Sequence, residues 1–191
     1  MEEAESRAVS LLPLMTQAIQ NNYGKGLKSL AFDFTNGELF LTVNEADESY
    51  RLPVGFGVPK RTDLSFHGEP YLAGITGRFA TDEDGCLVLK VRISFLEIAN
   101  TRILKIFFHG DAIVTQWSEL PGRMYLFNAL DAIMNEIKLY PFLQTVLSTM
   151  DAGFVRYKIL KALEPEVTGK LQNDIKIEKE ETPIPFIRNS G

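Results

Sequence analysis

The spacing of hydrophobic and polar residues divides the chain into a strand-like part and a helix-like part. Between residues 71 and 117 apolar positions alternate with polar ones, and short turns rich in Gly and Asp separate several runs. Alternation with a period of two is typical of half-buried strands. The runs are Tyr71–Ala80, Cys86–Phe95, Arg102–Phe108 and Ala112–Trp117. Their short links predict an antiparallel meander, around which we expect the rest of the chain to be arranged.

The segment before the meander predicts one helix and one hairpin. Apolar residues at helical spacing predict a helix that begins near Ser10, with Pro13 in its first turn. A strand from Leu27 ends at Asn36-Gly37, which favours a tight hairpin turn because both positions need a positive φ. The return strand is Glu38–Val43.

Glycine and proline mark irregular places between that hairpin and the meander. The run over residues 50–58 contains Pro53, which predicts an edge strand or a strand that leaves the sheet. Residues 61–70 predict a loop. Inside the first run of the meander, Gly74 and Gly77 predict a bulge or close packing of another element over that spot.

After residue 122 the apolar period becomes helical. Three amphipathic segments follow between Leu126 and Leu163, and each is too apolar on one side to stand free. We therefore expect them to pack on the sheet, on each other or on a partner. They also predict an exposed apolar patch that would suit a homodimer or a protein partner. From Glu166 onward the chain is charged and then punctuated by prolines, which predicts an extended tail.

These patterns predict an α+β fold in three parts. Residues 1–122 hold the N-terminal helix and an antiparallel β-meander of about seven strands, either a curved sheet or a partly open, lipocalin-like barrel. Residues 123–165 form two or three helices that close one face or one end, and residues 166–191 form the charged tail.

Composition narrows the classes of function. The net charge of -5 gives no general attraction to nucleic acid, and the single cysteine excludes an internal disulfide and a thiolate zinc site. No apolar run approaches the roughly 18–20 residues that a membrane-crossing helix needs. The acidic N-terminus lacks the basic region of a signal peptide, so we expect a cytoplasmic protein with no membrane partner.

Candidate catalytic groups are few. The two histidines, His67 and His109, stand in turns, and a catalytic histidine needs a nucleophile or an orienting carboxylate beside it. The cluster Asp82-Glu83-Asp84 lacks the later glutamate of a calcium loop. Glu97 lies in an apolar stretch and is expected to mark a strand end. Without a Ser-x-x-Lys, Gly-x-Ser-x-Gly, phosphate-loop or metal motif, the sequence favours a non-enzyme with no metal and no cofactor.

A ligand cavity inside the curved sheet is the main binding-site hypothesis. Five aromatic residues of the meander could line such a cavity, although core packing explains the same residues. They are Tyr71, Phe79, Phe95, Phe107 and Trp117.

The order of short motifs in the meander resembles a known domain. Leu52-Pro53-Val54-Gly55-Phe56-Gly57, then Ala73-Gly74-Ile75-Thr76-Gly77-Arg78-Phe79, a strand ending at Glu97, and Gly110-Asp111 follow one another. This resembles the C-terminal β-rich domain of Firmicutes β-lactamase-related, penicillin-binding-protein-like serine hydrolases, over roughly residues 27–122. Arg78-Phe79 and Ile98-Ala99-Asn100-Thr101 depart from the usual pattern. The catalytic Ser-x-x-Lys of that group lies in its other domain, so the resemblance implies a non-catalytic accessory part.

The favoured interpretation is therefore a non-catalytic accessory or binding domain of the kind attached to serine hydrolases, which interacts with a protein. One alternative is a stand-alone, lipocalin-like carrier of a small apolar ligand. Another is a hydrolase with an unrecognised site, which requires His67 or His109 to lie within hydrogen-bond reach of a serine and a carboxylate.

Overall fold

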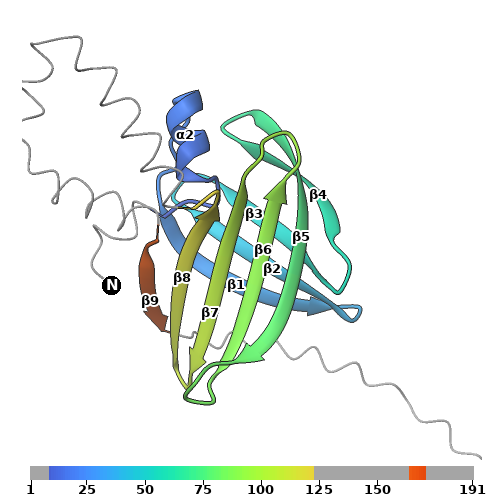
Figure 1. Ribbon diagram of the computed structural model, residues 1–191, viewed down its shortest axis with the longest axis vertical. Helices are drawn as coiled ribbons and strands as arrows, with labels where there is room; N and C mark the ends of the chain where they lie inside the picture. Colours follow the sequence, from blue (N-terminus) through green and yellow to red (C-terminus); the bar gives the residue numbers. More distant parts are fainter. Residues whose placement is uncertain (1–8, 123–163, 171–191) are drawn as a thin grey trace, which may run out of the picture.

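The computed structural model describes residues 9–122 and 164–170. These residues form one short helix and a nine-stranded sheet (Figure 1). The helix is α2 (Leu14–Gln20). The strands are β1 (Leu27–Thr35), β2 (Glu38–Glu45), β3 (Ser49–Phe56), β4 (Lys60–Phe66), β5 (Glu69–Thr81), β6 (Leu87–Phe95), β7 (Thr101–His109), β8 (Ala112–Leu120) and β9 (Glu166–Lys170). Neighbouring strands follow the order β1-β2-β3-β5-β6-β7-β8-β9, and β4 pairs with β5.

The first hairpin forms as the sequence predicts. Asn36 and Gly37 have φ values of 54° and 76°, and Thr35 faces Glu38 across the turn. This register fixes which residues of β2 point to the core, because neighbouring side chains on a strand point to opposite faces. Leu39, Leu41 and Val43 are buried as a result.

Two strands share one edge of the long strand β5. β4 pairs antiparallel with residues 69–75 of β5, and the last two residues of β3 pair parallel with Thr76 and Gly77. Residues 49–54 of β3 pair with β2 on one side, and β5 pairs with β3 only at Gly55 and Phe56. Pro53 therefore lies in the part of β3 that has one neighbouring strand, as expected for a proline in an edge strand. The loop predicted over residues 61–70 is wrong, because Leu64 and Phe66 are buried on alternate positions of β4.

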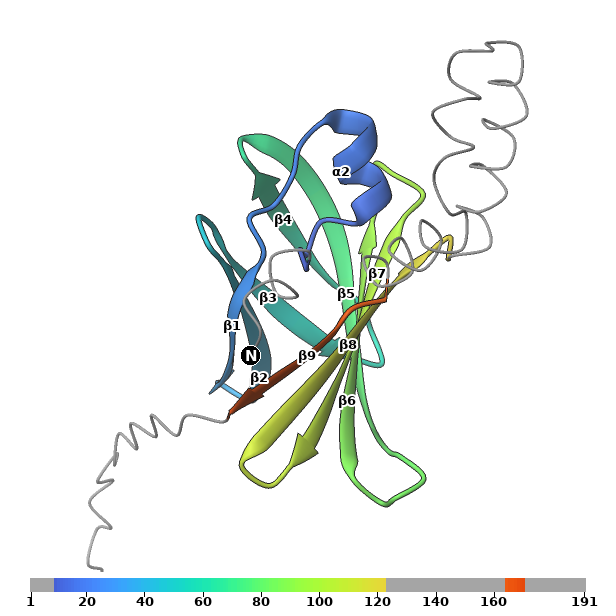
Figure 2. The ribbon, with the colours of Figure 1, turned by 90° about the vertical axis from the view of Figure 1, so that its left-hand side faces the viewer.

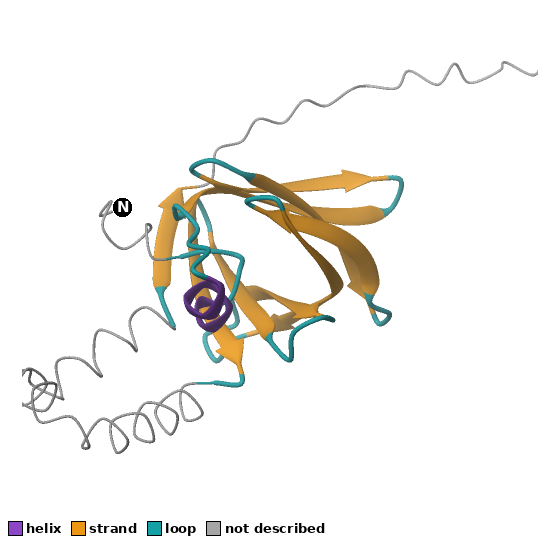
Figure 3. Ribbon diagram, turned by 90° about the horizontal axis from the view of Figure 1, so that it is seen from above, coloured by secondary structure: helices purple, strands orange, loops and turns teal. Residues whose placement is uncertain are grey.

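The sheet curls into a half-barrel whose inner face forms the core (Figure 3). Residues of even number on β7 and of odd number on β5, β6 and β8 point inward. Helix α2 lies at one end of the half-barrel, and the β5–β6 and β7–β8 turns lie at the opposite end (Figures 1 and 2).

The structure corrects two predicted numbers. The described residues form nine strands rather than about seven, since β4 and β9 were not expected. Helix α2 begins at Leu14 rather than near Ser10, and Pro13 is its N-cap rather than a residue of its first turn. The described part is thus mostly β with little helix, which is narrower than the predicted α+β class. The helices predicted between Leu126 and Leu163 lie outside the described residues. Strand β9 lies where the extended tail was predicted to start.

Candidate functional site

Three charged side chains lie on the inner face of the half-barrel. Arg102 of β7 and Glu119 of β8 face each other in neighbouring strands, with Arg102 Nη1 3.2 Å from Glu119 Oε2, and both side chains are 1% exposed. Glu45 ends β2 and is also buried. The Arg102 guanidinium lies 5.5 Å from the centre of the Trp117 ring. The buried pair leaves Arg102 Nε and Glu119 Oε1 without hydrogen-bond partners.

Burial controls the protonation of this cluster. Loss of hydration lowers the pKa of Arg102 to about 10, although the two carboxylates oppose the change, so its charge remains at neutral pH. Burial raises the pKa of Glu119 despite the neighbouring Arg102, and it also raises the pKa of Glu45. The interior therefore holds one permanent positive charge and two carboxyl groups that resist ionisation.

The carboxyl groups anchor the segment that precedes the sheet. Glu45 Oε1 accepts hydrogen bonds from Leu11 N at 2.7 Å and from Ser10 Oγ at 3.0 Å. Glu119 Oε2 accepts one from Leu14 N at 2.8 Å, at the first residue of α2. Because Leu11 and Leu12 are almost fully buried in the same core, this segment fills one end of the half-barrel.

The return of the chain from α2 to β1 depends on a close approach at Gly24. A Cβ atom there would lie 2.5 Å from Ser10 Oγ and 2.6 Å from Glu45 Oε2, which is shorter than van der Waals contact. Gly24 N also donates to Gln17 Oε1 at 3.0 Å. Only glycine fits beside the anchor without moving it.

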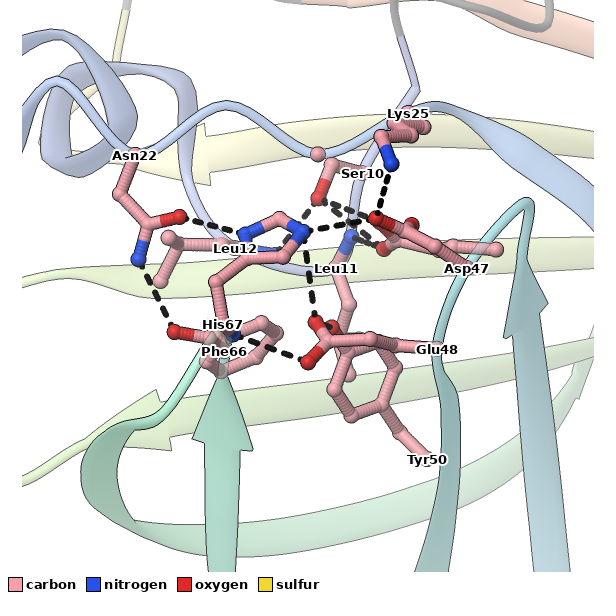
Figure 4. A network of polar contacts seen from close by, with 12 residues as sticks. Ser10, Leu11, Leu12, Asn22, Lys25, Asp47, Glu48, Tyr50, Phe66 and His67 are labelled. Carbon is pink, nitrogen blue, oxygen red and sulfur yellow. Dashed lines mark hydrogen bonds and ion pairs between the residues drawn. The ribbon is translucent and has the colours of Figure 1, made fainter.

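A second polar network, around His67, ties three loops together (Figure 4). His67 stands in the β4–β5 turn; its Nδ1 lies 2.6 Å from Asn22 Oδ1 and its Nε2 lies 2.9 Å from Asp47 Oδ2. Asn22 Nδ2 donates to Phe66 O, so the Asn22 oxygen is an acceptor and both ring nitrogens face acceptors. Lys25 Nζ completes the network 3.1 Å from Asp47. The hydrogen bond from His67 is the main cause of a lowered pKa at Asp47.

This network has a structural geometry. Both ring nitrogens of His67 are occupied by Asn22 and Asp47, and among the described residues neither nitrogen has a serine or cysteine as a partner. His109 stacks on Phe107 at the end of β7, with ring centroids 6.3 Å apart. Neither arrangement shows the nucleophile that the hydrolase alternative needs. Among the described residues there is also no group of three or more His, Cys, Asp or Glu that could hold a metal ion.

Three of the five predicted cavity residues are buried in the core, and the other two are not. Tyr71 and Phe95 contact each other edge to face in the core, with ring centroids 5.8 Å apart. Trp117 is buried beside Arg102. Phe107 alternates with inward-pointing residues of β7 and so lies on the outer face. Phe79 is 47% exposed near the end of β5.

Other polar candidates of the sequence have local roles. Both Glu97 oxygens accept from Leu72 N, at 2.8 and 2.9 Å, so Glu97 ties the β6–β7 loop to β5. Asp82 accepts from the backbone of Asp84 and of Cys86 and thereby shapes the β5–β6 turn. One hollow of about 380 Å3 lies over the β2–β3 turn and is lined by polar side chains that include Lys28, Asn44 and Glu48.

An apolar cluster is exposed at the end of the half-barrel opposite α2. Phe56 and Phe79 stack with ring centroids 5.6 Å apart and planes 13° apart. Leu87 begins β6, diagonally across from Phe79, and each of the three side chains is nearly half exposed. We call Phe56, Phe79 and Leu87 the aromatic rim. A Cβ at Gly77 would stand 3.5 Å from Phe56 Cε1, which is an ordinary contact, but only 2.3 Å from Val54 Cγ1, so this glycine makes room for Val54 rather than for the rim.

Comparisons with family models, with curated proteins and with solved structures find no match to this chain. Within the described residues, no helix is both long enough and apolar enough to cross a membrane. The candidate site therefore rests on geometry alone, and the aromatic rim is a stacked aromatic pair with a third half-exposed apolar side chain beside it.

Proposed function

We propose that this protein is a non-catalytic binding domain that docks a partner protein on the aromatic rim. The observation that carries the proposal is the stacked and half-exposed pair Phe56–Phe79, with Leu87 beside it. Exposed aromatic side chains held in one rigid arrangement are typical of the anchors of protein interfaces. Both residues belong to strands rather than to loops and their rings stack on each other, so we expect little side-chain entropy to be lost when a partner binds.

The filled interior supports the same proposal. The anchored segment around Leu11 and Leu12 fills one end of the half-barrel, and Tyr71, Phe95 and Trp117 pack in its core. The apolar side chains left for a partner are therefore those exposed at the opposite end, in the aromatic rim. The sequence resemblance suggests a serine hydrolase as the class of partner, with this domain covering or gating the active site of that enzyme.

The proposal can be tested by site-specific photocross-linking in the cells that make the protein. A benzoylphenylalanine at position 79 should give one defined adduct, because the residue it replaces is aromatic and half exposed. The control is the same group at Glu83, which is exposed in the β5–β6 turn. A Phe56→Ser substitution should abolish the adduct at position 79. An adduct at twice the mass of the chain would make a second copy the partner. Equal yields at positions 79 and 83, or none at either, would overturn the proposal.

A curled sheet with an apolar inner face favours a second candidate, the carrier of a small apolar ligand. In this structure that space is shared with Leu11 and Leu12, so a carrier must first release its N-terminal segment from Glu45 and Glu119. Native mass spectrometry distinguishes the two candidates, since a carrier copurifies with its ligand.

A further inference from the structure

The outer face of the half-barrel carries a row of positive charges. In the sheet register, Arg78 of β5 faces Lys90 of β6, and Lys90 faces Lys105 of β7. Arg92 lies two residues beyond Lys90 on the same face of β6. The intervening Val91 is buried in the core, so all four cations point away from it. We call these four residues the basic face; the strands that carry it run side by side in Figure 1.

These cations have no compensating charge in the described part of the chain. The ion pairs there join Lys25, Arg51 and Lys60 to carboxylates, and pair Arg102 with Glu119 inside the core. None of the ion pairs includes a member of the basic face. The whole protein, by contrast, has more acidic than basic residues, 25 against 20. In a chain with an excess of acidic residues, four clustered and unpaired cations are unexpected.

The arrangement is unfavourable for the isolated domain. Like charges directly opposite each other on neighbouring antiparallel strands destabilise a sheet. Here Lys90 has a cation opposite it on both sides, at a strand spacing of roughly 4.8 Å. An anionic partner would neutralise these cations on binding, and the relief of their repulsion would add to the favourable free energy of binding.

We propose that the basic face is a docking surface for an acidic segment of a partner protein. This inference deepens the proposed function, on which it rests for the protein nature of the partner. The basic face extends over three neighbouring strands, about 10 Å, and over the two residues from Lys90 to Arg92 along β6, about 7 Å. This area suits a few carboxylates rather than a long phosphate backbone. Half-buried Ile103 and Phe107 alternate with Lys105 on β7, giving the mixed apolar and charged character of a protein interface.

Nucleic acid fits the same surface less well. Single-stranded nucleic acid binds through successive bases that stack on several aromatic side chains. The outward positions of β6 and β7 offer only Phe107 and its stacked neighbour His109.

The test measures fluorescence anisotropy of labelled deca-glutamate titrated with the full chain. Binding should weaken as salt rises, and Lys90→Glu with Lys105→Glu should raise the dissociation constant at least tenfold. The matched control is Lys28→Glu with Arg61→Glu, two exposed cations outside the ion pairs of the described residues, which changes the net charge by the same amount on β1 and β4 and should change affinity less than threefold. In the Lys90/Lys105 variant the repulsive pair of residues 78 and 90 becomes attractive, while residues 90 and 105 remain one like-charge pair, now of two carboxylates. With one repulsive pair instead of two, this variant should melt at or above the wild-type temperature, which separates lost binding from lost folding.

Other outcomes would overturn the inference. Equal weakening by both double variants would show an effect of net charge alone. Binding of labelled oligo-adenylate or of phosphatidylserine vesicles, without binding of deca-glutamate, would assign the face to nucleic acid or membrane. Absence of binding to every probe would remove the surface as an anion site. The rim variant Phe56→Ser should leave deca-glutamate binding unchanged, so failure of this inference is distinguishable from failure of the rim proposal.

Discussion

Removing the buried cation should destabilise the protein more than any surface change. In the Arg102→Met variant, Glu119 keeps its place in the core, because Leu14 N still donates to it, but it loses the only cation 3.2 Å away. The uncompensated carboxyl must then either stay charged in the core or take up a proton. Breaking a buried pair by removing one partner costs about 3–5 kcal/mol.

The partner substitution and the double variant separate the pair from its surroundings. Glu119→Gln keeps an oxygen for Leu14 N but leaves Arg102 buried with only the more distant Glu45 as a counter-charge. Arg102→Met with Glu119→Gln removes both charges. If the interaction between the two residues is the main term, the double variant should be less destabilised than the sum of the two single variants by about 2 kcal/mol or more.

The assay is urea unfolding at neutral pH, followed by the fluorescence of Trp117. That residue is the single tryptophan, is 1% exposed, and lies 5.5 Å from the Arg102 guanidinium, so its emission reports on this part of the core. The slope of the free energy against urea should be the same in all variants. A cost below about 1 kcal/mol for Arg102→Met, or additive single substitutions, would refute the reasoning.

Four further predictions follow from the anchor and the basic face. Glu45→Ala should lower the free energy of unfolding by about 2–3 kcal/mol, because Leu11 N–H and Ser10 O–H lose their acceptor, whereas Glu45→Gln should cost less; chemical denaturation measures both. Because the pKa of Glu45 is raised on folding, the folded protein holds a proton on Glu45 at pH values where the unfolded chain has lost it. The stability contributed by the protonated Glu45 is therefore complete below the ordinary pKa of a glutamate and is lost as pH rises through the pKa of the folded state. Glu45→Gln should reduce this dependence of the melting temperature on pH, which melting curves at several pH values measure. Gly24→Ala should cost about 1–3 kcal/mol by overpacking, while Gly169→Ala, with open space around it, should cost less than 1 kcal/mol in the same denaturation assay. Lys90→Glu should stabilise the domain by about 1 kcal/mol by replacing two repulsive neighbours with attractive ones, visible as a higher melting temperature.

Local signals in the sequence predicted local structure well. Asn36-Gly37 forms the expected turn because its two residues carry the positive φ values that the turn demands. Gly77 was expected to mark a bulge or close packing of another element, and the structure shows the close packing, with Val54 Cγ1 only 2.3 Å from where a Cβ of residue 77 would stand. Both predictions depend on backbone sterics within a few residues, which a sequence records directly.

The pairings between distant segments were not visible in the same way. Strand β9 follows β8 in the sheet but is separated from it by more than forty residues, so no turn signal marks the pairing. Residues 61–70 read as a loop because of their polar character, and only the partner β5 makes them a strand. In both cases tertiary contacts decide a local structure that intrinsic preference leaves open.

The buried charges were missed although a signal existed. Arg102 shares the parity of Leu104 and Ile106 on β7, and Glu45 shares the parity of Leu41 and Val43 on β2. A charged residue in register with an apolar face is either exposed at a strand end or buried with a partner. The sequence of one strand cannot decide between these, because the partner Glu119 comes from a neighbouring strand.

The central claim is that this domain acts through exposed side chains, those of the aromatic rim and of the basic face, and keeps the opposite end of its interior for its own N-terminal segment. Native mass spectrometry of the purified chain, under gentle and then denaturing conditions, tests it most directly. The account predicts the bare chain of 21.5 kDa, or a multiple of it, under both conditions. A small molecule that copurifies with the folded protein and is lost on denaturation would contradict the account, and would show that the segment at Leu11 and Leu12 gives way to a ligand.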